Sequence, residues 1–224
     1  MKRSVINNHI SEAIEFLTRM KFALPPFAYW STEEWKTKGP EYDEIRDNQL
    51  GWDLTDFGSN DFNKTGLLLF TLRNGNINKP KGKPYAEKLL IVKPGQLTPY
   101  HFHKSKMEDI INRGSEGTLK VKLYCSLESG TLDEKSDVPV SVDGRNFTVK
   151  PGTVISLASG ESITLFKGVF HQFWSDDAIL LLGEVSMVND DHKDNFFLEE
   201  NGRFPAIDED EEPLHLLVGD YSKK

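Results

Sequence analysis

The sequence is poor in cysteine and in basic charge. It has a single cysteine, Cys125, among 224 residues. A disulfide within the chain is therefore impossible, and such usage is typical of proteins in a reducing compartment. The formal net charge is −8 at pH 7. Nucleic acids and anionic membrane surfaces attract basic faces, so this balance argues against both as partners.

Long hydrophobic runs are also missing. The longest apolar stretches, such as AILLLG at 178–183, are far shorter than the roughly 20 residues that a membrane-spanning helix needs. The opening residues MKRSVINNHISEAIEF carry charges but no apolar core of the kind that a signal peptide has. We therefore expect a soluble, cytoplasmic protein.

The first 49 residues are predicted to be a helical extension. Ile10, Ile14 and Leu17 recur at helical spacing, and Pro25 and Pro26 are expected to end this helix. In the STEEW segment at 31–35, a serine precedes a glutamate by three positions, which is a capping-box pattern for a second, short helix.

From about residue 50 the chain changes to short runs of strand-forming residues separated by glycine, proline, asparagine and aspartate. This pattern is typical of a β-sandwich or barrel, which we place at residues 50–190. Asp143 and Gly144 are predicted to form a hairpin turn. Residues 191–224 are polar and irregular, and Pro205 and Pro213 predict that this tail lies across the barrel without adding strands. The whole chain, 1–224, is interpreted as one domain. The runs are 67–72, 86–92, 118–127, 139–149, 153–157, 162–166, 169–174 and 178–188.

Two segments carry the residues best suited to a metal site. His101 and His103 lie two positions apart on a predicted strand, so both side chains face the same way, and Glu108 is close enough to turn back to that face. His171 follows a glycine turn at the start of a later strand. Imidazoles with one carboxylate suit Mn, Fe, Co, Ni or Zn. The remaining histidines, His9, His192 and His215, are interpreted as surface or core residues.

These segments, GQLTPYHFHKSKME at 95–108 and GESITLFKGVFH at 160–171, resemble the two motifs of the cupin superfamily. The resemblance implies a mainly β fold, a cupin-type barrel of the jelly-roll kind. It also implies one divalent metal ion bound by His101, His103, Glu108 and His171.

A further carboxylate is placed by strand register. VFHQFW and ILLLGEV are predicted to form a hairpin with its turn near Asp176, which sets Glu184 opposite Val169 and on the face of His171. A carboxylate in an apolar barrel is costly to bury unless it has a task or a partner. Glu184 is thus a candidate general base with a raised pKa, or it pairs with an inward lysine or arginine.

Three basic residues are candidates for contacts with a substrate. Lys106 lies between two of the predicted ligands and Lys88 lies on a strand that leads towards them. Either could orient a hydroxylated substrate or donate a proton, or could be exposed as most lysines are. Arg203 could close the site from the tail.

Several segments outside the metal motif resemble the D-lyxose isomerases, which are metal-dependent cupin sugar isomerases. They are LPPFAYWSTEEW (24–35), YHFHKSKMEDIINRG (100–114), NGRFPAIDEDEEP (201–213) and GDY (219–221). The resemblance implies interconversion of D-lyxose and D-xylulose, with D-mannose and D-fructose as a second pair and Mn²⁺ as the metal.

Our hypothesis is that Glu184 carries the proton between two sugar carbons, while Lys106 or another group handles the proton on oxygen. A metal-assisted hydride shift would need the same metal but less of the base. Two alternatives stay open: an Fe²⁺-dependent cupin dioxygenase, and a non-catalytic sugar-binding cupin. Because a barrel of this kind must cover its edge strands, we also expect a homodimer.

Overall fold

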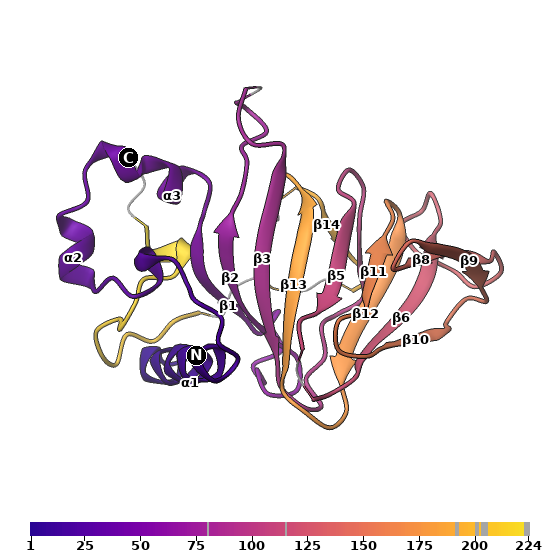
Figure 1. Cartoon of the computed structure of the whole chain (residues 1–224), viewed down its shortest axis with the longest axis horizontal. Helices are drawn as coiled ribbons and strands as arrows, with labels where there is room; N and C mark the ends of the chain where they lie inside the picture. The colour runs from indigo at the N-terminus through magenta and orange to yellow at the C-terminus, as the bar shows by residue number, and fades with distance from the viewer. Residues whose placement is uncertain (80, 115, 191–192, 200–201, 203–205, 222–224) are drawn as a thin grey trace.

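The computed structural model describes residues 1–79, 81–114, 116–190, 193–199, 202 and 206–221 (Figure 1). The N-terminal residues form the predicted helix, α1 (Arg3–Arg19), because Ile6, Ile10 and Leu17 recur on one buried face. The helix ends at Arg19, before the two prolines. The capping box of Ser31 and Glu34 is also confirmed and begins a short helix. The remaining helical elements are η1 (Pro26–Ala28), α2 (Thr32–Lys36), η2 (Pro40–Tyr42), α3 (Asp43–Asp47) and η3 (Val218–Asp220).

The rest of the described chain is mainly β-strand, as the sequence predicts. The strands form two antiparallel sheets that curl around a common interior (Figure 1). The first sheet has the order β1 (Gly51–Thr55), β2 (Leu67–Arg73), β3 (Tyr85–Val92), β13 (Leu180–Met187), β5 (Glu108–Asn112), β11 (Ser162–Leu165), β8 (Val138–Val142) and β9 (Arg145–Val149). The second has the order β10 (Val154–Leu157), β6 (Leu119–Ser126), β12 (Val169–Ser175), β4 (His101–His103) and β14 (Asn195–Phe197), with β7 (Leu132–Asp133) paired to β6.

The predicted turn at Asp143 and Gly144 joins β8 to β9 directly. Both residues have positive φ, 48° and 79°. Paired positive φ values are what a two-residue hairpin turn needs in order to match the twist of its strands. The prediction is confirmed.

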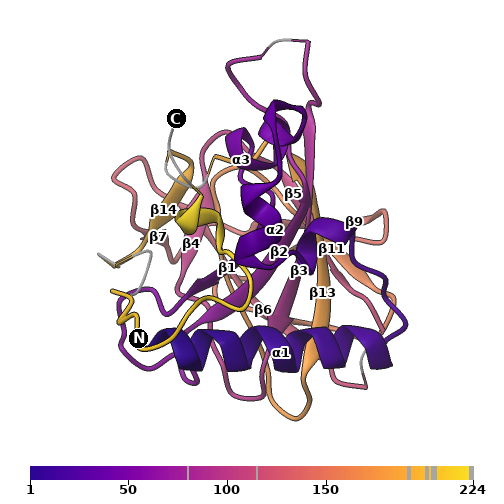
Figure 2. The ribbon, with the colours of Figure 1, turned by 90° about the vertical axis from the view of Figure 1, so that its left-hand side faces the viewer.

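Two apolar clusters hold these layers together. The inner cluster lies between the sheets and includes Leu90 from β3, Ile110 from β5 and Phe173 from β12. The outer cluster joins the far face of β3 to α1, which lies across the β1–β3 side of the first sheet (Figure 2). Because β3 is covered on both faces, its second half, LLIV at 89–92, is continuously apolar, and the buried charge of Lys88 beside it is exceptional.

The prediction that β12 and β13 pair as a hairpin is wrong. β12 pairs with β6 and β4 in the second sheet, while β13 pairs with β3 and β5 in the first. The short connection at 176–179 therefore crosses from one sheet to the other. Glu184 consequently lies opposite Lys88 and Ile110 and not opposite Val169. Both edges of β12 are already occupied, so no edge remains for a hairpin partner.

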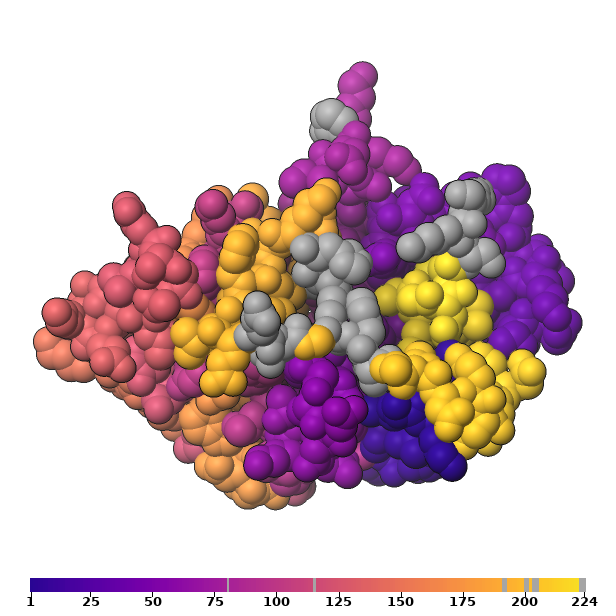
Figure 3. Space-filling view, turned by 180° about the vertical axis from the view of Figure 1, so that it is seen from behind, coloured from indigo at the N-terminus to yellow at the C-terminus, as the bar shows by residue number. Residues whose placement is uncertain are grey.

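The tail also differs in one place from the prediction that it adds no strand, because β14 pairs with β4. Further on, residues 206–221 run beside the N-terminal helix, as the yellow and indigo surfaces in Figure 3 show. The buried Arg3 donates hydrogen bonds to the carboxylates of Glu209 and Asp220. Among the helices of the described residues, none combines the length and apolar character needed to cross a bilayer.

Candidate active site

Three histidines meet on neighbouring strands of the second sheet. His101 and His103 are alternate residues of β4, so their side chains share a face, and His171 on β12 is the cross-strand partner of His101. One ring nitrogen from each histidine lies within 4.8 Å of those of the other two. The predicted convergence of these side chains is therefore observed.

Each imidazole is oriented by a backbone carbonyl behind it. Nδ1 of His101 lies 3.0 Å from the carbonyl of Pro99, and Nδ1 of His171 lies 3.0 Å from that of Val169. Nδ1 of His103 lies 3.2 Å from the carbonyl of Asp194. A carbonyl at Nδ1 requires the proton there, which leaves Nε2 with its lone pair. This is the usual arrangement of histidines that bind a metal.

The spacing of the Nε2 atoms also fits a metal ion. Nε2 of His101 lies 3.0 Å from Nε2 of His171. Two nitrogens that are each ~2.1 Å from one ion and roughly at right angles would be about 3 Å apart. Burial lowers the pKa of His171 to about 4 and lowers the pKa of His101 well below 6.5. The neutral rings are the form that binds metal.

Glu108, the first residue of β5, faces the same point. Its Oε1 lies 3.3 Å from Nε2 of His103 and 3.5 Å from Nε2 of His171. Its Oε2 lies 2.6 Å from Nζ of Lys106. Burial alone would raise the pKa of Glu108, but the Lys106 ammonium and the imidazoles outweigh it and hold the pKa well below 4.5. The four predicted ligands are thus brought together, with the carboxylate ionised.

Glu184 lies in the same cavity on β13. Its Oε1 is 3.0 Å from Nζ of Lys106 and 3.7 Å from Nζ of Lys88, and it accepts a hydrogen bond of 3.0 Å from Ser186. The exposed fractions of Lys106, Lys88 and Glu184 are only 3%, 4% and 5%. The alternative that Glu184 pairs with an inward lysine is therefore realised, and both lysines are buried rather than exposed.

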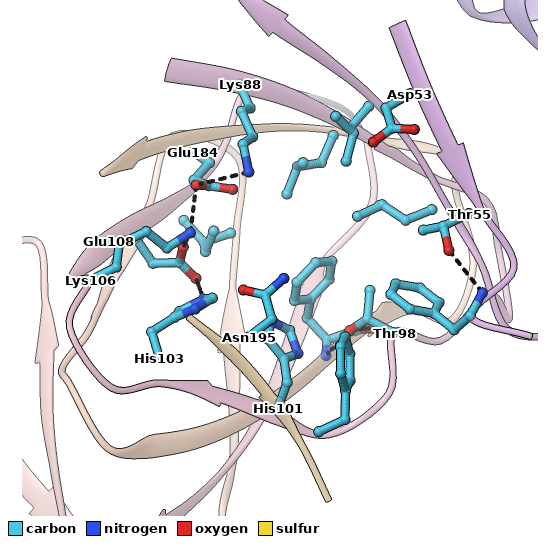
Figure 4. Close-up of a pocket in the computed structure, with 17 residues that line it drawn as sticks. Asp53, Thr55, Lys88, Thr98, His101, His103, Lys106, Glu108, Glu184 and Asn195 are labelled. Carbon is cyan, nitrogen blue, oxygen red and sulfur yellow. Dashed lines mark hydrogen bonds and ion pairs between the residues drawn. The ribbon is translucent and has the colours of Figure 1, made fainter. Parts of the chain in front are cut away.

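These contacts form a line of alternating buried charges: Glu108, Lys106, Glu184 and Lys88 (Figure 4). Two negative and two positive groups balance one another, which makes their burial tolerable. The line begins at the histidines and ends on β3. The ammonium of Lys106 therefore contacts the candidate ligand Glu108 directly, and the carboxylate of Glu184 lies on the other side of that ammonium.

The loop that carries Lys106 is fixed by Asp194. The carboxylate of Asp194 accepts hydrogen bonds from the backbone amides of Ser105 at 2.7 Å and Lys106 at 2.8 Å. Its carbonyl oxygen is the one that faces His103. One residue, immediately before β14, therefore orients both a candidate ligand and the candidate catalytic lysine.

The cavity is also lined by polar residues that the sequence reasoning missed, chiefly because the strands β1 and β14 were not predicted. Asp53 and Thr55 come from β1, Asn195 comes from β14, and Thr98 precedes β4 (Figure 4). The aspartate within the mainly apolar segment GWDLT was the one signal in the sequence for a polar residue in the cavity wall. The predicted Arg203 lies outside the described residues. Apolar side chains complete the wall: Phe57, Leu67, Leu69, Leu90, Ile110, Phe173 and Phe197.

Comparisons with known proteins agree with this geometry. Residues 1–221 match the family model of D-lyxose isomerase. The chain belongs to the D-lyxose isomerase family. Two curated relatives are named D-lyxose/D-mannose isomerase: one from Serratia proteamaculans is 44% identical, and one from Escherichia coli O157:H7 is 43% identical. Each alignment covers 99% of this chain and 98% of the relative.

Solved structures show the fold of this D-lyxose isomerase family member. The L-ribose isomerase of Cellulomonas parahominis, without ligand, superposes with a TM-score of 0.59 at 16% identity. That of Acinetobacter sp. DL28, in complex with L-ribose, gives 0.57 at 17% identity. Both comparisons cover 89% of this chain and 93% of the other. The predicted cupin-type fold is confirmed, and the family assignment makes the protein a sugar isomerase.

Proposed function

We propose that this isomerase interconverts D-lyxose and D-xylulose, with D-mannose and D-fructose as a second pair, and that it uses one divalent metal ion, Mn²⁺. The observation that carries the proposal is that Glu184 and Lys106 line one cavity together with histidines of a cluster that could hold a metal ion. The names of the curated relatives supply the two aldoses, D-lyxose and D-mannose.

The residues that would hold the metal are His101, His103, Glu108 and His171. Their donor set, three neutral imidazoles and one carboxylate, suits Mn²⁺ among other divalent ions. A metal bound there would supply Lewis-acid stabilisation of the negative charge that develops on the sugar oxygens. Glu108 would bind the metal through Oε1, since Lys106 already lies against its Oε2.

Aldose–ketose isomerisation moves one hydrogen between C1 and C2 of the sugar. We assign this transfer to the carboxylate of Glu184, which takes the proton from one carbon and returns it to the other. The contacts to Lys106, Lys88 and Ser186 all use Oε1 of Glu184. Oε2 is therefore the atom that we assign to the proton.

The two lysines have different tasks in this scheme. Lys106 lies between Glu108 and Glu184, at the point where charge changes during the reaction, and we assign to it the proton on the sugar oxygen. Lys88 lies on the opposite side of Glu184, where its ammonium reaches the cavity, and we assign to it a hydrogen bond to a sugar hydroxyl.

The proposal is tested with purified protein, a panel of aldoses and deuterated water. Turnover of D-lyxose and D-mannose is expected, with solvent deuterium appearing at C1 or C2 of the product. Full retention of hydrogen would remove the proton-transfer step and favour a hydride shift. Oxygen consumption would favour the dioxygenase, and sugar binding without turnover would favour the non-catalytic cupin.

A further inference from the structure

The ammonium of Lys106 has a third acceptor besides the two carboxylates. Nζ of Lys106 donates to Oδ1 of Asn189 over 3.0 Å, in addition to its contacts with Glu184 at 3.0 Å and Glu108 at 2.6 Å. The contacts with Asn189 and Glu184 are hydrogen bonds, and the contact with Glu108 is an ion pair. Asn189 follows β13 and does not line the cavity.

The backbone of Asn189 is fixed by hydrogen bonds to the side chain of Asn74. Its backbone N–H donates to Oδ1 of Asn74 over 3.0 Å, and its carbonyl accepts from Nδ2 of Asn74 over 3.0 Å. The side-chain amide of Asn74 thus pairs with the main chain of Asn189 as a neighbouring strand would. The backbone on which Asn189 presents its Oδ1 is fixed by this pairing.

Asn74 is anchored in turn by Asn48, the residue that ends α3. Nδ2 of Asn48 donates to the carbonyl of Asn74 over 2.9 Å, and Nδ2 of Asn74 lies 3.3 Å from the carbonyl of Asn48. Both side chains are buried. We call Asn48, Asn74 and Asn189 the asparagine bridge. It connects the N-terminal helical extension to Lys106 through neutral hydrogen bonds.

We propose that Asn189 is a positioning residue for Lys106, a proposal that rests on the catalytic role assigned to that lysine. A lysine side chain has four rotatable bonds, and attraction to two carboxylates does not by itself select one orientation of the ammonium. The side-chain oxygen of Asn189 fixes the direction of one N–H, and an apolar side chain in its place would leave that N–H without this acceptor.

The test compares substitutions that remove the acceptor with one that keeps it. Asn189→Leu and Asn189→Ala remove it, whereas Asn189→Asp retains an oxygen in the same place. The matched control is Asn78→Ala, an exposed asparagine on the same side of the molecule. We expect the first two to lower kcat on D-lyxose about 10-fold to 100-fold, the range for one hydrogen bond to a charged group. KM and Mn²⁺ affinity should be unchanged, Asn189→Asp should recover most of kcat, and Asn78→Ala should match the parent.

Unchanged kcat in both acceptor-free variants would overturn the proposal, as would equal losses in Asn189→Leu and Asn189→Asp. A crystal structure of Asn189→Leu provides a readout independent of turnover. Movement of the Lys106 ammonium away from Oε1 of Glu184 supports the proposal, and an unmoved ammonium contradicts it. If the parent protein itself fails to isomerise any sugar, the proposed function fails, while the crystal structure still decides the position of Lys106.

Discussion

Replacing Glu184 by glutamine removes the proposed base while keeping its shape. The residue is 5% exposed, and its Oε1 contacts Lys106 and Lys88. Loss of general acid–base catalysis lowers turnover by ~10²–10⁴-fold, which corresponds to roughly 2.7–5.5 kcal/mol of transition-state stabilisation. The four side chains proposed to bind the metal are untouched, so the Mn²⁺ content should stay at one ion per chain.

The same change should also reduce stability. The line of alternating charges loses one negative member and keeps both lysines, so a net positive charge is buried. Removing one partner of a buried pair costs about 3–5 kcal/mol. We expect less, roughly 2–4 kcal/mol, because Lys106 keeps Glu108 at 2.6 Å. Chemical denaturation monitored by fluorescence measures this loss.

Glu87→Gln is a matched control for that experiment. Glu87 is the neighbour of Lys88 on β3 but lies on the other face of the sheet, where it pairs with Arg73 at 3.1 Å. The control should keep the parent's kcat. Turnover of Glu184→Gln near that of the parent, with metal bound, would refute the assignment of Glu184 as the base.

Two further predictions concern metal binding by His171 and the ion pair between Arg3 and Glu209 in the C-terminal tail. His171→Ala should weaken Mn²⁺ binding by more than ~100-fold, since even residues that merely support a ligand contribute 10–100-fold; equilibrium dialysis measures this, and unchanged affinity would remove His171 from the ligand set. At the tail, the hydrogen bond from Arg3 holds the pKa of Glu209 below its ordinary 4.5. A carboxyl whose pKa is lower in the folded protein stabilises the fold at pH values above its pKa in the unfolded chain. This stabilisation is lost as the pH falls through the pKa of the folded protein. Because the Glu209 side chain is 55% exposed, Glu209→Gln should cost under about 1 kcal/mol at pH 7. The difference in free energy of unfolding between Glu209→Gln and the parent should shrink as pH falls from 5 to 3.5. A difference that widened on acidification would contradict a stabilising ion pair between Arg3 and Glu209.

The histidines could be located from the sequence because their geometry is local. Alternation along a strand places His101 and His103 on one face whatever strand lies beside them. The pairing of His171 with His101 is a long-range contact, and it came from the resemblance to a known family. The approach of Glu108 depended on a short loop, whose shape is set by Asp194 some 90 residues later and could not be read from the spacing.

Glu184 shows how a wrong register can still give the right face. The connection at 176–179 is short enough for a hairpin, and nothing in its residues distinguishes a turn from a crossing between sheets. Alternation within β13, however, puts Leu180, Leu182 and Glu184 on one face regardless of the neighbouring strand. That face borders the cavity in either arrangement. The partner strand was therefore wrong, while the orientation of the side chain was right.

Other parts of the site depend on contacts between distant segments. Asp53 reaches the cavity from β1 and Asn195 from β14, and short strands of this kind have little periodicity to reveal them. The role of Arg203 stays a prediction, as do the single domain, the homodimer and the cytoplasmic location.

The central claim is that three histidines and Glu108 hold a metal that the isomerisation requires. Its most direct test is the rate of D-lyxose isomerisation by protein stripped of metal with a chelator, followed by titration with Mn²⁺. We expect almost no activity without metal, and a rise that saturates at one Mn²⁺ per chain. Full activity in the stripped protein, or saturation with no D-xylulose formed, would contradict it.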